Sequence, residues 1–168
     1  MNLVYRVSAL AAATLSIALT AGASPAPTQA PAAYVTSVPG ALRVELSADR
    51  AIYHVGDPVR LRIILQNVSN VPLSHHLNGP ANDFVLNVLD ASGARIEPHG
   101  LLSLNVVSGH PAILSPGVRL VETATRHGDD YRPISDWGYA LTRPSTYSIR
   151  AKLKATSIAS NAISIVVH

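Results

Sequence analysis

Residues 56–66 read Gly-Asp-Pro-Val-Arg-Leu-Arg-Ile-Ile-Leu-Gln, and this stretch decides the fold class. Gly-Asp-Pro is a turn sequence, because glycine accepts a positive φ and proline fixes its own φ. After the turn, Val59, Leu61, Ile63 and Leu65 alternate with residues that are mostly polar. Alternation over this length predicts a strand that buries one face and leaves the other in water.

The same alternation recurs on both sides of this stretch, and no sustained helical periodicity follows the first 23 residues. Asp90-Ala91-Ser92-Gly93 is typical of a hairpin turn. About eight short strands separated by turn signals predict an all-β fold, an antiparallel β-sandwich. The predicted strands cover residues 42–47, 59–66, 84–89, 102–106, 118–122, 139–142, 147–154 and 163–167.

The first 40 residues have a different composition. Residues 1–6 carry one positive side chain, residues 7–20 are mostly apolar, and Ala21-Gly22-Ala23 is a run of small residues. This order predicts a secretory signal that is cleaved after Ala23. The alternative is a membrane anchor, but the apolar run is shorter than the roughly 20 strongly apolar residues that a span needs.

Residues 24–40 follow as a Pro/Ala-rich segment, which favours an extended linker. The predicted organisation is therefore signal 1–23, linker 24–40 and sandwich 41–168. It predicts a periplasmic or secreted protein with no membrane span after signal cleavage.

Composition bears on several classes of partner. The chain has 168 residues, a formal net charge of +3 and no cysteine. Its basic residues are scattered, whereas nucleic-acid binding needs a clustered basic patch, so we expect no nucleic-acid partner. Without cysteine the chain has neither disulfides nor a thiolate metal site. An exported domain of this kind must therefore obtain its stability from its hydrophobic core.

The chain has a set of turn and core segments at residues 53–61, 65–70, 84–90, 114–117, 144–151 and 160–165. These segments resemble bacterial immunoglobulin-like β-sandwich domains. Among these, the chain is similar to intracellular proteinase inhibitor-like domains and to the sandwich repeats of bacterial macroglobulins. The resemblance spans about residues 41–167 and implies a sandwich that binds or spaces other proteins. It departs from the usual pattern at Ser145, where a glycine commonly precedes the Thr-Tyr pair, and in the long polar stretch 126–138.

Tyr147 follows the turn at Pro144 and heads a predicted strand. A tyrosine in this position buries its ring and returns its hydroxyl to nearby backbone, which is the tyrosine corner of Greek-key sandwiches. We therefore expect Tyr147 to belong to the core.

Two groups of residues suggest metal ligands. His75 and His76 are adjacent, but neighbours on an extended strand point to opposite faces, so the pair need not share an ion. Asp129, Asp130 and Asp136 could offer oxygen ligands to calcium, but the spacing of a calcium loop is absent. The sequence therefore predicts no metal site and no cofactor, with both groups in solvated loops.

Enzymatic function finds little support. No Gly-x-Ser-x-Gly motif occurs, and the acidic residues are few and dispersed. We predict no catalytic residues and a non-enzymatic protein. A small metal-handling protein or hydrolase that uses the loop histidines and aspartates remains the alternative.

A binding surface is predicted in the stretch 126–139. Aromatic and arginine side chains in loops are typical of binding hot spots, although aromatic residues also close the ends of sandwich cores. The predicted partner is another protein, and the predicted role is that of a non-catalytic binding or accessory domain of the cell envelope. Protease inhibition is the more specific version of this predicted binding role, and a passive spacer is a further alternative. The candidate binding residues are Arg126, Asp130, Tyr131, Arg132, Trp137 and Tyr139.

Overall fold

The computed structural model describes residues 40–100, 110–125, 127–154 and 156–168. The predicted signal and nearly all of the predicted linker lie outside these residues, as does the strand expected at 102–106. No helix in the described part of the chain is long and apolar enough to span a membrane. The elements are β1 (Leu42–Ala48), β2 (Ile52–Tyr53), β3 (Arg60–Asn67), β4 (Leu73–Leu77), α1 (Pro80–Asp83), β5 (Phe84–Leu89), β6 (His110–Leu114), β7 (Arg119–Val121), β8 (Arg132–Pro133), the 3₁₀ helix η1 (Ile134–Trp137), β9 (Ser145–Leu153) and β10 (Ile163–Val167).

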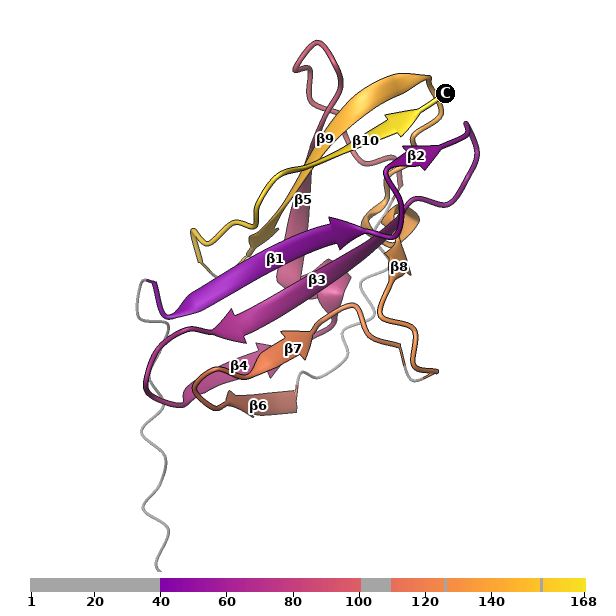
Figure 1. Cartoon of the computed structure of the whole chain (residues 1–168). Coiled ribbons are helices and arrows are strands. Elements are labelled where there is room, and N and C mark those ends of the chain that lie inside the picture. The colour runs from indigo at the N-terminus through magenta and orange to yellow at the C-terminus, as the bar shows by residue number, and fades with distance from the viewer. Residues whose placement is uncertain (1–39, 101–109, 126, 155) are drawn as a thin grey trace, which may run out of the picture. The chain divides into compact units, whose positions relative to one another are not determined.

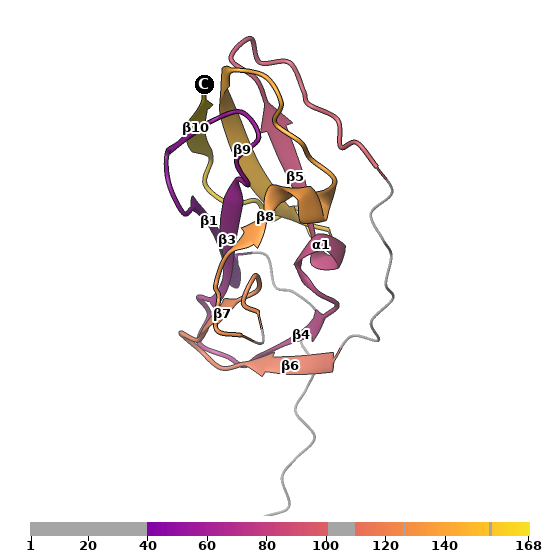
Figure 2. The ribbon, with the colours of Figure 1, turned by 90° about the vertical axis from the view of Figure 1, so that its right-hand side faces the viewer.

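The described strands form a β-sandwich, as the sequence predicts (Figures 1 and 2). One four-stranded sheet has the order β1-β3-β7, with β8 also paired to β3. The other has the order β2-β10-β9-β5, and β4 and β6 form a separate two-stranded sheet. The pairings are antiparallel except that of β2 with β10, which is parallel. The chain therefore changes sheets between β1 and β2.

The core lies between the two larger sheets because both bury alternate residues. Val44 of β1 pairs with Leu65 of β3, within a register that runs from Leu42 opposite Asn67 to Ala48 opposite Leu61. These apolar side chains join those of the other sheet in one buried cluster. Burial of apolar surface from both layers is the main force that holds a sandwich together.

Tyr147 forms the predicted tyrosine corner. Its ring is buried, and its hydroxyl donates a hydrogen bond of 2.8 Å to the carbonyl oxygen of Arg143. The predicted hairpin turn also forms, because the Gly93 amide donates to the Asp90 carbonyl and Leu89 bridges to Arg95.

Two expectations for local structure were wrong. His75 and His76 lie in β4 and not in a loop, because β4 pairs with β6 along its whole length. Residues 139–142 form no strand; this segment leads from η1 toward β9 and contributes buried side chains at Tyr139 and Leu141.

Outward-facing backbone groups on two edge strands are covered by side chains or by nearby backbone. On β1, the side-chain amide of Asn161 accepts a hydrogen bond from the Leu46 amide and donates one to the Leu46 carbonyl, each of 3.0 Å. On β5, the Tyr139 hydroxyl donates to the Leu86 carbonyl at 2.8 Å, and the Ile96 amide donates to the Val88 carbonyl. Covered edges are less able to pair with strands of other chains.

Asn67, at the end of β3, is fully buried and fully hydrogen-bonded. Its side-chain nitrogen donates to the carbonyl oxygens of Val71 and Leu114, both at 2.8 Å. Its side-chain oxygen accepts from the amide and the hydroxyl of Ser69. One amide thereby joins β3, the following turn and the end of β6.

Candidate functional site

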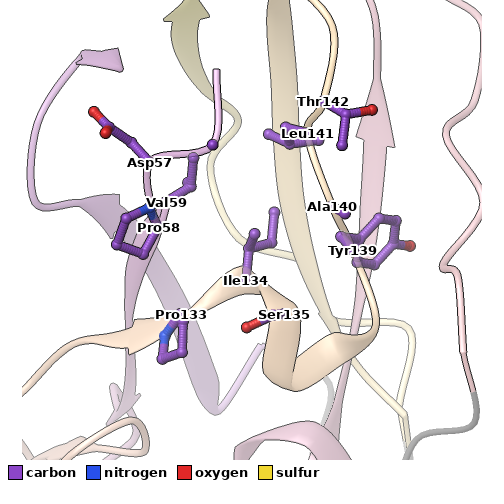
Figure 3. A pocket seen from close by; sticks show the side chains of 11 residues that line it. Asp57, Pro58, Val59, Pro133, Ile134, Ser135, Tyr139, Ala140, Leu141 and Thr142 are labelled. Atoms are coloured by element: carbon purple, nitrogen blue, oxygen red, sulfur yellow. The ribbon is translucent and has the colours of Figure 1, made fainter. Parts of the chain in front are cut away.

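A shallow hollow of about 280 Å³ lies where the turn before β3 meets the segment from β8 to Thr142 (Figure 3). Its floor and walls are mostly apolar, with Val59, Ile134 and Leu141 among the lining residues. Ser135 and Thr142 contribute hydroxyl groups to the lining. A concave apolar surface with a few polar groups is the usual form of a small binding site.

Local hydrogen bonds set the two walls of the hollow. In the first wall, Gly56 has a φ of 94°, which an L-residue rarely adopts. The Asp57 carboxylate accepts a hydrogen bond from the His54 amide, and it also pairs with Arg50 at 3.1 Å. The Ile134 amide donates to the Val59 carbonyl at 2.8 Å, which ties the second wall to the first.

Gly138 ends η1 and so directs the second wall. Its φ of 80° is left-handed, and its amide donates to the carbonyl of Ser135. A Cβ at this position would also lie 3.3 Å from the Cβ of Pro98, which is a tight approach. Glycine is therefore favoured here both by backbone conformation and by space.

The predicted binding residues divide into those near the surface and those in the core. Asp130, Tyr131 and Arg132 are partly exposed. Asp130 pairs with Arg62 at 3.0 Å, and Arg132 lies 3.4 Å from Asp136. Arg126 lies outside the described residues.

Trp137 and Tyr139 are buried in the core, unlike the other described candidate binding residues. Trp137 is 2% exposed and Tyr139 is 4% exposed. The Tyr139 hydroxyl is engaged with the Leu86 carbonyl, and burial is the largest cause that raises the pKa of this phenol. Both rings close the core, which is the alternative that the sequence left open for aromatic residues in this stretch. Tyr139 also lines the hollow, as Figure 3 shows.

The aspartates considered for calcium are matched to arginines. Asp129 hydrogen-bonds with Arg60, and the amide of Tyr131 together with that guanidinium holds the pKa of Asp129 below its usual range. The ion pairs of Asp130 and Asp136 involve two further arginines. Each of these carboxylates thus has its own counter-charge, and among the described residues they form no common ligand group.

The described residues include one group that could hold a metal ion, formed by His75, Asp83 and Glu122. None of these residues lines the hollow. The sequence did not indicate the group, because its members come from three separate segments. Only His75 was considered as a ligand, and it was considered with His76, which is exposed.

Comparisons with known proteins add the following. No protein-family model matches the chain, and no curated protein matches it. A β-glucosidase from Erythrobacter marinus is 19% identical with a TM-score of 0.41, and the match covers 76% of this chain and 15% of that one. The CARDB domain of a Pyrococcus furiosus protein, solved in complex with di-metal ions, is 12% identical with a TM-score of 0.39, and the match covers 75% and 91% of the two chains.

A DNA glycosylase from Pseudomonas fluorescens, AlkC, is 10% identical with a TM-score of 0.42 over 76% of this chain and 30% of that chain. The chain thus spans only a small part of the glucosidase and of the glycosylase. These likenesses are similarities of fold.

Proposed function

We propose that this chain is an exported, non-catalytic β-sandwich domain that binds another protein through the end of the sandwich where the hollow lies. The observation that carries the proposal is the hollow itself. Its walls are mostly apolar, and the polar residues Asp57, Ser135 and Thr142 are among the residues that line it. This combination suits one apolar side chain of a partner together with hydrogen bonds to the partner's backbone.

The covered edges also favour recognition by this surface. A partner that added a strand along β1 or β5 would need free backbone groups there, but Asn161 and Tyr139 already bond to outward-facing groups of these two strands. Loops on a rigid sandwich offer a binding surface that needs no such edge.

Protease inhibition is a more specific version of this proposed protein-binding role, and it rests on the resemblance to proteinase inhibitor-like domains. An inhibitor must reduce protease activity in proportion to its concentration. Titration of the purified protein into a panel of serine, cysteine and metalloproteases tests this directly. Full activity of every protease at an excess of the protein would remove the inhibitor hypothesis and leave a binding or spacing role.

The hollow is tested with a filled variant and a matched control. Ala140 lines the hollow and is exposed, so Ala140→Trp should fill it without disturbing the core. Ala94 is exposed in the β5 hairpin turn, so Ala94→Trp adds the same side chain elsewhere. The wild-type protein and both variants serve as bait against envelope and secreted fractions, with mass-spectrometric quantification.

A partner that is enriched near equal stoichiometry by the wild type and by Ala94→Trp, and lost with Ala140→Trp, supports the proposed surface. Equal enrichment by all three proteins would place the contact elsewhere on the domain. Repeated absence of any enriched partner would contradict the proposed protein-binding role.

A further inference from the structure

A second group of polar side chains lies among β4, α1 and the end of β7. His75 comes from β4, Asp83 is the last residue of α1, and Glu122 directly follows β7. Figure 2 shows α1 and β4 next to each other in this part of the domain. Each of the three residues supplies an atom that can ligate a metal ion, and these atoms all lie within 4.8 Å of one another.

Local structure directs each side chain inward. Successive side chains of a strand alternate between faces, so His75 shares a face with Leu73, which is buried in the core. The Asp83 carboxylate accepts hydrogen bonds of 2.8 Å from the backbone amide and the side-chain nitrogen of Asn78. The Glu122 amide donates to the Ile63 carbonyl, which fixes the residue beside β3.

The Glu122 carboxylate is buried without a hydrogen bond to one of its oxygens. The side chain is 3% exposed, and its Oε1 atom has no hydrogen-bond partner among the described residues. Nε2 of His75 lies 3.2 Å from this oxygen, yet it also makes no hydrogen bond, although the separation would allow an ion pair. The two atoms approach each other without the alignment of a hydrogen bond. A buried polar atom that lacks a partner requires an explanation such as an ion.

The charge of the cluster also favours a bound cation. With both carboxylates ionised, protonation of the single imidazole would still leave the cluster with excess negative charge. Within the described part of the chain, neither Asp83 nor Glu122 forms an ion pair with an arginine or a lysine. Buried charge is costly unless it is paired or coordinates a metal.

We propose that His75, Asp83 and Glu122 bind one divalent transition-metal ion, with Zn²⁺ as the representative, through Nε2 of His75 and one oxygen of each carboxylate. Imidazole and carboxylate are both ligands of zinc. Two such ligands on one tetrahedral zinc ion lie about 3.3–3.6 Å apart, given metal–ligand bonds of about 2.0–2.2 Å. The distance of 3.2 Å between His75 and Glu122 fits this geometry.

Asn78 has a supporting role in this site. Its two hydrogen bonds hold the Asp83 carboxylate in one orientation, while a carboxylate has further lone pairs available for a metal ion. Hydrogen-bond partners of this kind orient metal ligands and raise the affinity of metal sites. Three protein ligands leave one position of a tetrahedral ion for water or another small ligand.

The competing explanation is a buried His75–Glu122 ion pair that binds no metal, and the test separates the two. The full-length gene is expressed, and the protein is purified in the form that the cell produces, with any affinity tag removed. After treatment with a chelator, Zn²⁺ is titrated against a competing fluorescent zinc indicator. Co²⁺ is then substituted, because its visible absorption reports the coordination geometry.

The variants are Glu122→Gln and His75→Ala, and the control is His76→Ala, which changes the exposed neighbour on β4. His168→Ala is a second control, because the His168 ring lies near that of His54 and the pair could bind metal weakly at the surface. We expect the wild type and both controls to bind one Zn²⁺ with a Kd below about 100 µM. Loss of a metal-orienting partner costs 10–100-fold in affinity, so loss of a ligand should cost about 100-fold or more.

Stability measurements keep the test informative if a variant folds poorly. In chelator, Glu122→Gln should be at least as stable as the wild type, because it removes excess charge from the empty cluster. In Zn²⁺ the order should reverse, because the metal stabilises the folded wild type. This reversal, together with 1:1 binding, supports the site. Absence of saturable wild-type binding below about 100 µM, unchanged affinity in both ligand variants, or equal destabilisation of Glu122→Gln in chelator and in Zn²⁺ would overturn it.

Discussion

Replacement of Asn67 by aspartate tests whether one buried amide holds the end of the sandwich together. The substitution preserves the shape of the side chain, but it replaces the nitrogen that donates to the carbonyls of Val71 and Leu114, each at 2.8 Å. A buried acceptor that loses its donor costs about 1–3 kcal/mol. We assign about 1 kcal/mol to Val71, whose bond is only partly buried, and up to about 3 kcal/mol to Leu114, whose bond is buried. Asn67→Asp should therefore lower the free energy of unfolding by about 2–4 kcal/mol from the lost donor alone, and burial of the new negative charge beside two carbonyl oxygens adds to this cost.

Urea denaturation followed by circular dichroism measures this change. The matched control is Asn87→Asp, because Asn87 is exposed on β5 and substitutions at exposed positions usually change stability by less than about 0.5 kcal/mol. The slope of unfolding free energy against urea should be equal in all three proteins, which shows that the folded and unfolded states compared are the same. If Asn67→Asp and Asn87→Asp had equal effects, the Asn67 network would not be a stabilising feature.

Three further predictions concern aromatic side chains. Trp137→Ala should lower the free energy of unfolding by about 3–5 kcal/mol, because the ring is buried; a change under 1 kcal/mol in urea denaturation would contradict its place in the core. Tyr147→Phe should cost about 0.5–1.5 kcal/mol through loss of the hydrogen bond to Arg143, measured as a shift of the urea midpoint, and an unchanged midpoint would count against the tyrosine corner. Burial, followed by the hydrogen bond to Asp49, raises the pKa of Tyr53 from 10.0 to about 12, so the folded state retains the phenolic proton to higher pH than the unfolded state. The wild type should therefore lose stability as pH rises from about 10 toward about 12, and Tyr53→Phe should lose less over the same pH range in the same assay; parallel losses would refute this linkage.

The longer strands could be predicted because their sequences alternate. Strand β10 has the predicted bounds Ile163–Val167, and β3 (Arg60–Asn67) is shifted by one residue from the predicted strand 59–66. Strands β2 and β8 have two residues each, too few for a period to be recognised. Strand β4 was missed because His75 takes the inward position that follows that of Leu73, so that the apolar alternation of the strand is interrupted.

The candidate sites depended on tertiary contacts and were less predictable. The sequence around Trp137 is compatible either with a binding loop at the surface or with aromatic side chains that close the end of the core. Only the packing of η1 against the sandwich distinguishes these two alternatives. The Asp83 and Glu122 side chains gave no sequence signal, because each stands alone in its segment and meets His75 only when three elements come together. The tyrosine corner was predictable because the turn, the ring and the hydroxyl acceptor are adjacent in sequence.

The hydrogen bonds between Asn161 and Leu46 also constrain how the chain can be made. The two residues are 115 positions apart, so a chain that grows from its N-terminus exposes this part of the β1 edge until residue 161 has been synthesised. At about 5–20 residues per second, this interval lasts roughly 6–23 seconds. During that time an open edge can pair with any neighbouring nascent strand. Protection by a chaperone, or delay of folding until the chain is complete, therefore matters more for this domain than for a sandwich whose edge is covered by adjacent sequence.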